Sequence, residues 1–97
     1  MAKFGEIVGE PTPVLIDFYF ELQEEENDAS VLRDVAAALG DRAKVVKIDI
    51  QKNQDLAAAL KVKANPTFMI YKSGELIWRK TGDVQANDLI STVEQYV

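Results

Sequence analysis

The chain has 97 residues, no cysteine and no histidine, a hydrophobic fraction of 47% and a formal net charge of -5. Without a thiolate it can form no disulfide and perform no dithiol exchange, and without an imidazole it lacks the commonest general base and nitrogen ligand of metals. This composition predicts one soluble globular domain over residues 1–97, and the negative charge argues against nucleic acid or an anionic membrane as partner.

The N-terminal segment leads into a strand. Apolar residues have helical spacing within residues 3–9, but two glycines there predict a short helix only. Two prolines in residues 10–13 favour an extended linker, because each disfavours a helix at the residue before it. Residues 14–20 are a nearly continuous apolar run, which is typical of a strand buried on both faces.

A helix and a second strand follow. Apolar residues form one stripe over residues 28–39, where Asn27 or Asp28 can cap the first turn and Gly40 can end the helix in the left-handed conformation. Residues 43–50 again have the pattern of a strand. A strand, a helix and a strand with short connections indicate a right-handed parallel crossover.

The second half of the chain predicts a short helix, a hairpin and a final helix. Asn53 can cap the short helix. Residues 67–72 and 75–80 are two strand-like runs separated by a Ser-Gly dipeptide, which is the pattern of a tight antiparallel hairpin. After Gly82, one apolar stripe predicts the last helix: Leu89, Ile90, Val93 and Val97.

The order β-α-β-α-β-β-α, with or without the short N-terminal helix, resembles the thioredoxin family. The resemblance depends on four stretches that span most of the chain beyond residue 12: residues 13–19, 45–49, 62–68, and 72–75 followed by Gly82. It implies an α/β, thioredoxin-like fold in which helices flank a mixed sheet of four to five strands. The short N-terminal segment implies that the first strand of a full thioredoxin is missing.

The redox site of that family has no counterpart here. Its Trp-Cys-x-x-Cys motif would fall within Leu22, Gln23, Glu24, Glu25 and Glu26. No carboxylate or amide can act as the attacking thiolate or the resolving thiol of disulfide exchange. We therefore predict a redox-inactive protein that is not an enzyme and needs no cofactor.

The acidic stretch of residues 21–28 carries five of the sixteen acidic residues and no base, so it accounts for the whole net charge. It can be a solvated loop that also caps the helix after it, or a surface for a basic partner. A calcium or magnesium site is a third interpretation, because oxygen ligands are present, although the spacing of an EF-hand is not.

Asn65, Pro66 and Thr67 match the cis-proline loop of thioredoxins, which in that family faces the active-site helix and presents backbone groups to an extended peptide. This loop could still bind a partner strand through backbone hydrogen bonds. The alternative is that Pro66 only shapes the turn before the next strand.

Asp17 lies within the first apolar strand and Lys47 within the second. The resemblance implies that they correspond to the buried acid behind the cysteines and its neighbouring lysine. They are either a remnant of redox chemistry or a buried pair that satisfies itself.

The function predicted is protein binding, as an adaptor, through the former active-site face. The candidate residues are Tyr19, Glu21, Leu22, Gln23, Glu24, Glu25, Glu26, Asn65, Pro66 and Thr67. Two alternatives stay open: a metal-assisted or carboxylate-based hydrolase at the acidic stretch, and a thioredoxin whose cysteines have been substituted in this sequence. The partner expected is a protein or an extended peptide, and its basic character is left open. A cytoplasmic location is expected because no secretory signal is recognisable, and the oligomeric state is left open.

Overall fold

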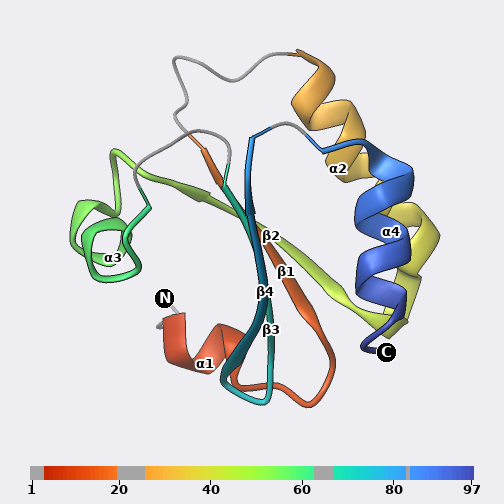
Figure 1. The fold of residues 1–97 in the computed structure, drawn as a ribbon, viewed down its shortest axis with the longest axis horizontal. Helices are drawn as coiled ribbons and strands as arrows, with labels where there is room; N and C mark the ends of the chain where they lie inside the picture. The colour runs from red at the N-terminus through yellow and green to blue at the C-terminus, as the bar shows by residue number, and fades with distance from the viewer. Residues whose placement is uncertain (1–3, 20–25, 63–66, 83) are drawn as a thin grey trace.

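The structure, a computed structural model, describes residues 4–19, 26–62, 67–82 and 84–97, and for residues 26–30 it describes the backbone alone. Figure 1 shows the strands of the sheet and the helices around them. In chain order the elements are α1 (Phe4–Val8), β1 (Val14–Tyr19), α2 (Glu26–Leu39), the 3-10 helix η2 (Gly40–Arg42), β2 (Lys44–Asp49), α3 (Gln54–Ala59), β3 (Thr67–Lys72), β4 (Glu75–Thr81) and α4 (Ala86–Glu94). The predicted order of elements is confirmed.

The four strands form one mixed sheet in the order β2-β1-β3-β4. β1 is parallel to β2 and antiparallel to β3, and β3 is antiparallel to β4. The parallel crossover through α2 is therefore confirmed. Among the residues that the structure describes, β2 is an edge strand and pairs with β1 alone.

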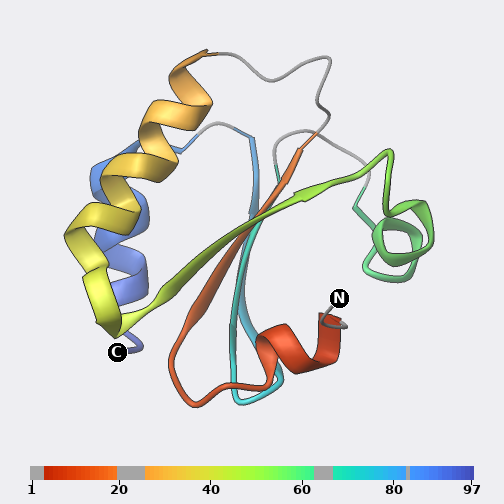
Figure 2. The same ribbon diagram turned by 180° about the vertical axis from the view of Figure 1, so that it is seen from behind.

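Helices cover both faces of the sheet. α1 and α3 lie on one face, and α2 and α4 lie on the other, as the two opposite views show (Figures 1 and 2). β1 is buried on both faces as predicted: Val14, Ile16 and Phe18 belong to the core beneath α1 and α3, whereas Leu15 belongs to the core beneath α2 and α4. Because β1 supplies side chains to both cores, it is the central strand around which both layers of helices pack.

The helix ends differ from prediction in detail. α2 begins at Glu26, two residues earlier than predicted. Gly40 has a φ of 54° after α2, as predicted. Asn53 precedes α3 but does not cap it with its side chain, since its Nδ2 donates to the carbonyl oxygen of Asp49 at 2.9 Å. Val97 lies beyond α4 and is 51% exposed, so its predicted place in the apolar stripe is wrong.

The predicted hairpin between β3 and β4 is confirmed, and it fastens the N-terminal helix. Ser73 and Gly74 have φ values of 54° and 82°, which is the pattern of the turn that matches strand twist. The Ser73 N–H donates to the carbonyl of Glu10 at 2.7 Å, and the Gly74 N–H donates to that of Val8 at 2.9 Å. The turn therefore ties α1 and its linker to the sheet.

Candidate functional site

One end of the sheet brings together the described residues nearest to the predicted site. β1 ends at Tyr19 and β3 begins at Thr67, and Phe18 is the register partner of Thr67 across these antiparallel strands. α2 begins at the same end of the sheet (Figure 1). Tyr19 is half-buried, whereas Thr67 is 1% exposed, so the Thr67 side chain is part of the core.

Most of the predicted binding residues lie outside the described part of the chain. These are Glu21, Leu22, Gln23, Glu24, Glu25, Asn65 and Pro66, and Glu26 is described only as the first residue of α2. The assignment of these residues to a partner site stays a prediction. What the structure adds is that β1, which precedes the first of these segments, and β3, which follows the second, lie side by side at one end of the sheet, where α2 also begins.

Asp17 and Lys47 are register partners on the parallel strands β1 and β2, but they differ in burial. Asp17 is 1% exposed, whereas Lys47 is exposed because β2 is an edge strand. The Lys47 ammonium lies 4.6 Å from the centroid of the Tyr19 ring, a distance at which a cation interacts favourably with an aromatic face. The two residues are therefore neighbours, but the lysine is not buried with the acid, and their interpretation as a remnant stays a prediction.

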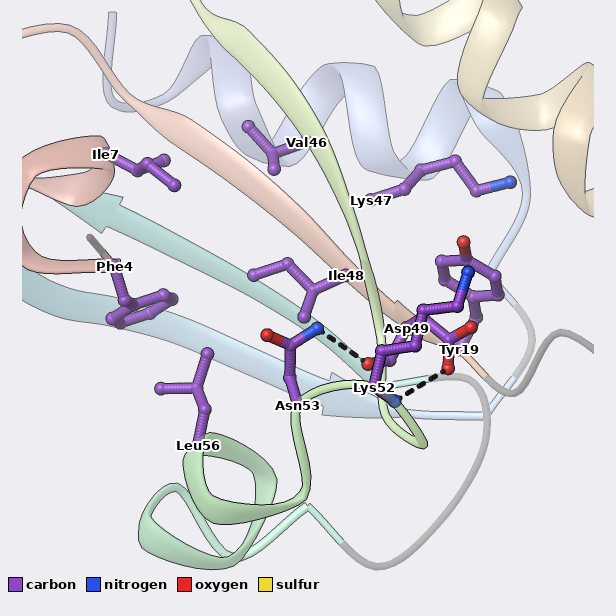
Figure 3. Close-up of a pocket in the computed structure, with 10 residues that line it drawn as sticks. All are labelled: Phe4, Ile7, Tyr19, Val46, Lys47, Ile48, Asp49, Lys52, Asn53 and Leu56. Carbon is purple, nitrogen blue, oxygen red and sulfur yellow. Dashed lines mark hydrogen bonds between the residues drawn. The ribbon is translucent and has the colours of Figure 1, made fainter. Parts of the chain in front are cut away.

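A groove of about 320 Å³ runs beside β2, and the sequence did not reveal it (Figure 3). Its apolar part is lined by Phe4 and Ile7 of α1, Val46 and Ile48 of β2, and Leu56 of α3. Its polar part is lined by Tyr19, Lys47, Asp49, Lys52 and Asn53. Helical spacing did predict α1, but periodicity along the chain cannot show that α1 and α3 stand apart on the same face of the sheet.

The polar end of the groove is fixed by a turn after β2. The Oδ1 atom of Asp49 accepts hydrogen bonds from the backbone N–H of Gln51 at 2.8 Å and of Lys52 at 3.4 Å. Together with the hydrogen bond from Asn53 to the Asp49 carbonyl, these contacts close the chain back toward α3 (Figure 3). Asp49 is 7% exposed, so its carboxylate mainly holds this turn.

Helix α1, which forms one wall of the groove, packs against the buried Tyr71. The rings of Phe4 and Tyr71 meet edge to face, with centroids 5.3 Å apart and planes at 87°. The Tyr71 hydroxyl donates to the Met69 sulfur at 3.9 Å. Burial raises the pKa of Tyr71 above its ordinary value of 10.0, and the nearby Arg79 guanidinium lowers this pKa to a smaller extent. Tyr71 therefore packs in the core.

Metal binding was one interpretation of the acidic stretch. Within the described residues, no group of three or more acidic, histidine or cysteine side chains is placed to hold a metal ion. The acidic side chains of residues 21–28 are not among those described, so the calcium or magnesium interpretation is not tested. In the same described part, no helix is long and apolar enough to cross a bilayer.

A mixed four-stranded sheet with helices on both faces is the thioredoxin-like fold that the sequence predicted, and solved structures confirm it. A mutant thioredoxin from Halobacterium salinarum has a TM-score of 0.81 and 28% identity, covering 99% of this chain and 84% of that one. Chloroplastic thioredoxin z has a TM-score of 0.80 and 29% identity, covering 93% and 82%.

The chain belongs to the thioredoxin family, whose model matches residues 1–95. It is 34% identical over 98 residues to the thioredoxin-like protein slr0233 of Synechocystis, with 99% of this chain and 93% of that protein covered. It is 39% identical over 83 residues to chloroplastic thioredoxin Y of rice (Oryza sativa), with 84% of this chain and 49% of that protein covered. The chain thus spans about half the length of this plant relative.

These relatives correct one prediction. The statement that the chain is not an enzyme is overturned, because its relatives are named thioredoxins, and thioredoxins are oxidoreductases. What the sequence supports is narrower: a chain without cysteine fits a redox-inactive form of the family, because dithiol exchange requires thiols.

Proposed function

We propose that this thioredoxin-family chain recognises protein partners as extended segments, at the end of the sheet where β1 ends and β3 begins, without forming a disulfide to them. The proposed binding residues are Tyr19, Glu21 to Glu26, and Asn65 to Thr67. The observation that carries the proposal is the register of β1 and β3, in which Phe18 lies beside Thr67. It supports a common surface, because the segments that follow Tyr19 and precede Thr67 both start from this end of the sheet.

Charge supports a basic partner. Residues 21–28 have five carboxylates and no base, and the other acids and bases of the chain cancel. A local excess of one charge attracts segments of opposite charge and speeds their association, and this attraction weakens with salt. The crystal structure of chloroplastic thioredoxin z defines a type-specific target recognition. We extend target recognition to this chain as part of the proposal.

The experiment is a titration of ¹⁵N-labelled protein with a basic extended peptide, acetyl-Ser-Arg-Ile-Arg-Val-Arg-Ser-amide, followed by amide chemical shifts. The proposal expects shifts at the amides of residues 19–28, 65 and 67, and an affinity that falls as sodium chloride is raised. The double variant Glu24→Lys, Glu25→Lys is expected to weaken binding by roughly tenfold or more. The double variant Asp41→Lys, Glu75→Lys changes the net charge equally at two exposed positions elsewhere and serves as the control.

Two outcomes would contradict the proposal. Shifts confined to other parts of the chain would show that the peptide binds elsewhere. An equal loss of affinity in both double variants would show that net charge alone attracts the peptide. The cytoplasmic location stays a separate prediction, since rice thioredoxin Y is named as chloroplastic.

A further inference from the structure

Tyr19 is the last residue of β1, and residues of β2 and of the turn after it hold both its backbone and its side chain. The Ile50 N–H donates to the Tyr19 carbonyl at 2.8 Å, which fixes the end of the strand. The Lys47 ammonium lies over the Tyr19 ring, 4.6 Å from its centroid. Figure 3 shows these two side chains next to each other. The ring therefore has a cation on one face at the point where β1 ends.

The register of the parallel strands explains why the two side chains meet. Lys47 is the register partner of Asp17 on β1, and Tyr19 lies two residues further along that strand. Side chains alternate between the two faces of a strand, so all three stand on the same face of the sheet. A diagonal pair on neighbouring strands is within reach of an aromatic ring and a long side chain. The contact thus follows from the pairing of β1 with β2.

The cation restricts a ring that is otherwise only partly held by packing. Tyr19 is half-buried, so part of its side chain is open to solvent. Attraction between an ammonium and a ring face stabilises the rotamer in which the two are in contact. An aromatic side chain that is already held in place gives a partner contact area at a low cost in conformational entropy. Whatever holds the Tyr19 ring should therefore affect the affinity for a partner.

We propose that Lys47 is a positioning residue for partner binding: its ammonium holds the Tyr19 ring in the orientation that receives the partner's extended segment. The role presupposes the proposed function, in which Tyr19 contacts the partner. It is opposite in sign to the direct effect of the charge, because a lysine near the site repels a basic partner. The direction of the change in affinity when the ammonium is removed therefore separates the two effects.

The test uses the full chain and the basic peptide acetyl-Ser-Arg-Ile-Arg-Val-Arg-Ser-amide. Lys47→Met keeps an apolar stem but removes the ammonium, and it should weaken binding by roughly threefold. Lys47→Gln, a polar replacement, should weaken binding equally. Lys47→Arg keeps a cation that stacks on aromatic rings and should keep the wild-type affinity. Lys80→Met makes the same change of charge at an exposed position of β4, the opposite edge strand, and should leave the affinity unchanged or slightly higher.

Two further measurements show whether Lys47 acts through the ring. Without peptide, the ¹H–¹³C signals of the Tyr19 ring should move in Lys47→Met and return toward their wild-type positions in Lys47→Arg. In the Tyr19→Leu background, Lys47→Met should no longer weaken binding, because the ring through which the lysine acts is absent. Amide spectra of each variant without peptide show whether it keeps the native fold.

Three outcomes would overturn this role of Lys47. The first is that Lys47→Met and Lys47→Gln bind the peptide as tightly as the wild type, or more tightly. The second is an equal weakening by Lys80→Met. The third is an equal weakening by Lys47→Met in the Tyr19→Leu background, which would mean that the lysine acts on the partner or on the fold directly.

The proposed function can fail separately from the role of Lys47. If the peptide shifts no amide of residues 19–28 in the wild type, the proposed function is contradicted, and the positioning role with it. If the peptide shifts these amides but removal of the Lys47 ammonium does not weaken binding, only the positioning role is contradicted.

Discussion

The buried phenol of Tyr71 should make the protein lose stability in alkaline solution, and Tyr71→Phe should remove part of that loss. Tyr71 is 6% exposed, and burial raises the pKa of its hydroxyl above 10.0. In the unfolded chain the phenol ionises near pH 10, whereas the folded protein keeps the proton to a higher pH. The folded state therefore binds more protons over this interval, and the free energy of unfolding must fall as the pH rises.

The size of this effect follows from the proton count. Below about pH 10 the phenol is protonated in both states, and its contribution to stability does not depend on pH. Between that pH and the raised pKa, one bound proton distinguishes the states, and the limiting slope is about 1.4 kcal/mol per pH unit. Urea unfolding followed by circular dichroism between pH 7 and pH 11.5 gives the free energy of unfolding against pH for the wild type and for Tyr71→Phe. Lysine and other titrations affect both proteins alike, so they cancel in the difference between the two curves.

The difference in free energy of unfolding between the two proteins should be constant up to about pH 10. Above that pH the wild type should lose stability faster than Tyr71→Phe. Phe4→Ala tests the physical cause, because it removes the ring that meets Tyr71 edge to face. In the Phe4→Ala background, the effect of Tyr71→Phe above pH 10 should shrink. A difference that stays flat to pH 11.5 in the wild-type background would refute the reasoning from burial.

Three further substitutions test the core, the hairpin and the attachment of α3. Leu15→Ala removes a side chain that is 0% exposed and should lower the free energy of unfolding in urea by about 3 kcal/mol, whereas Leu76→Ala, at a site 41% exposed, should change it by less than about 0.5 kcal/mol. Ser73→Asn should raise the free energy of unfolding by about 0.5 kcal/mol, because asparagine tolerates the φ of 54° better than serine does. An unchanged or lower free energy of unfolding would contradict this account of the turn. Arg79 donates to the carbonyls of residues 60 and 61 at 2.5 and 2.7 Å, so Arg79→Met should cost about 1 kcal/mol and speed hydrogen exchange in α3, and unaltered exchange there would contradict this role.

The sequence predicted the elements of this fold because most local signals agree with the tertiary structure. The apolar run at residues 14–20, the stripe of α2 and the Ser-Gly hairpin each had one straightforward interpretation. Asn53 stands at the N-cap position of α3 as predicted, but its side chain makes no capping hydrogen bond because it donates to the carbonyl of Asp49, four residues earlier. The two acceptors are both close in sequence, so residue type and spacing alone could not show which of them this side chain would choose.

The groove beside β2 could not be predicted for a related reason. The groove depends on the positions of α1 and α3 on one face of the sheet, which the spacing of residues along the chain does not give. Lys47 illustrates the difference. Its place on a neighbouring strand to Asp17 was predicted, yet its exposure follows from the edge position of β2.

Recognition of partners without a disulfide is tested most directly by photo-crosslinking in extract from the source cells. The photoreactive residue p-benzoylphenylalanine replaces Tyr19 in one sample and the exposed Leu76 of β4 in the other. We expect one or a few discrete partners to be captured through position 19 and not through position 76, with the same yield in the presence of dithiothreitol. Equal capture at both positions, no capture at position 19, or complexes that the reductant releases would contradict binding at this end of the sheet by a chain that forms no disulfide.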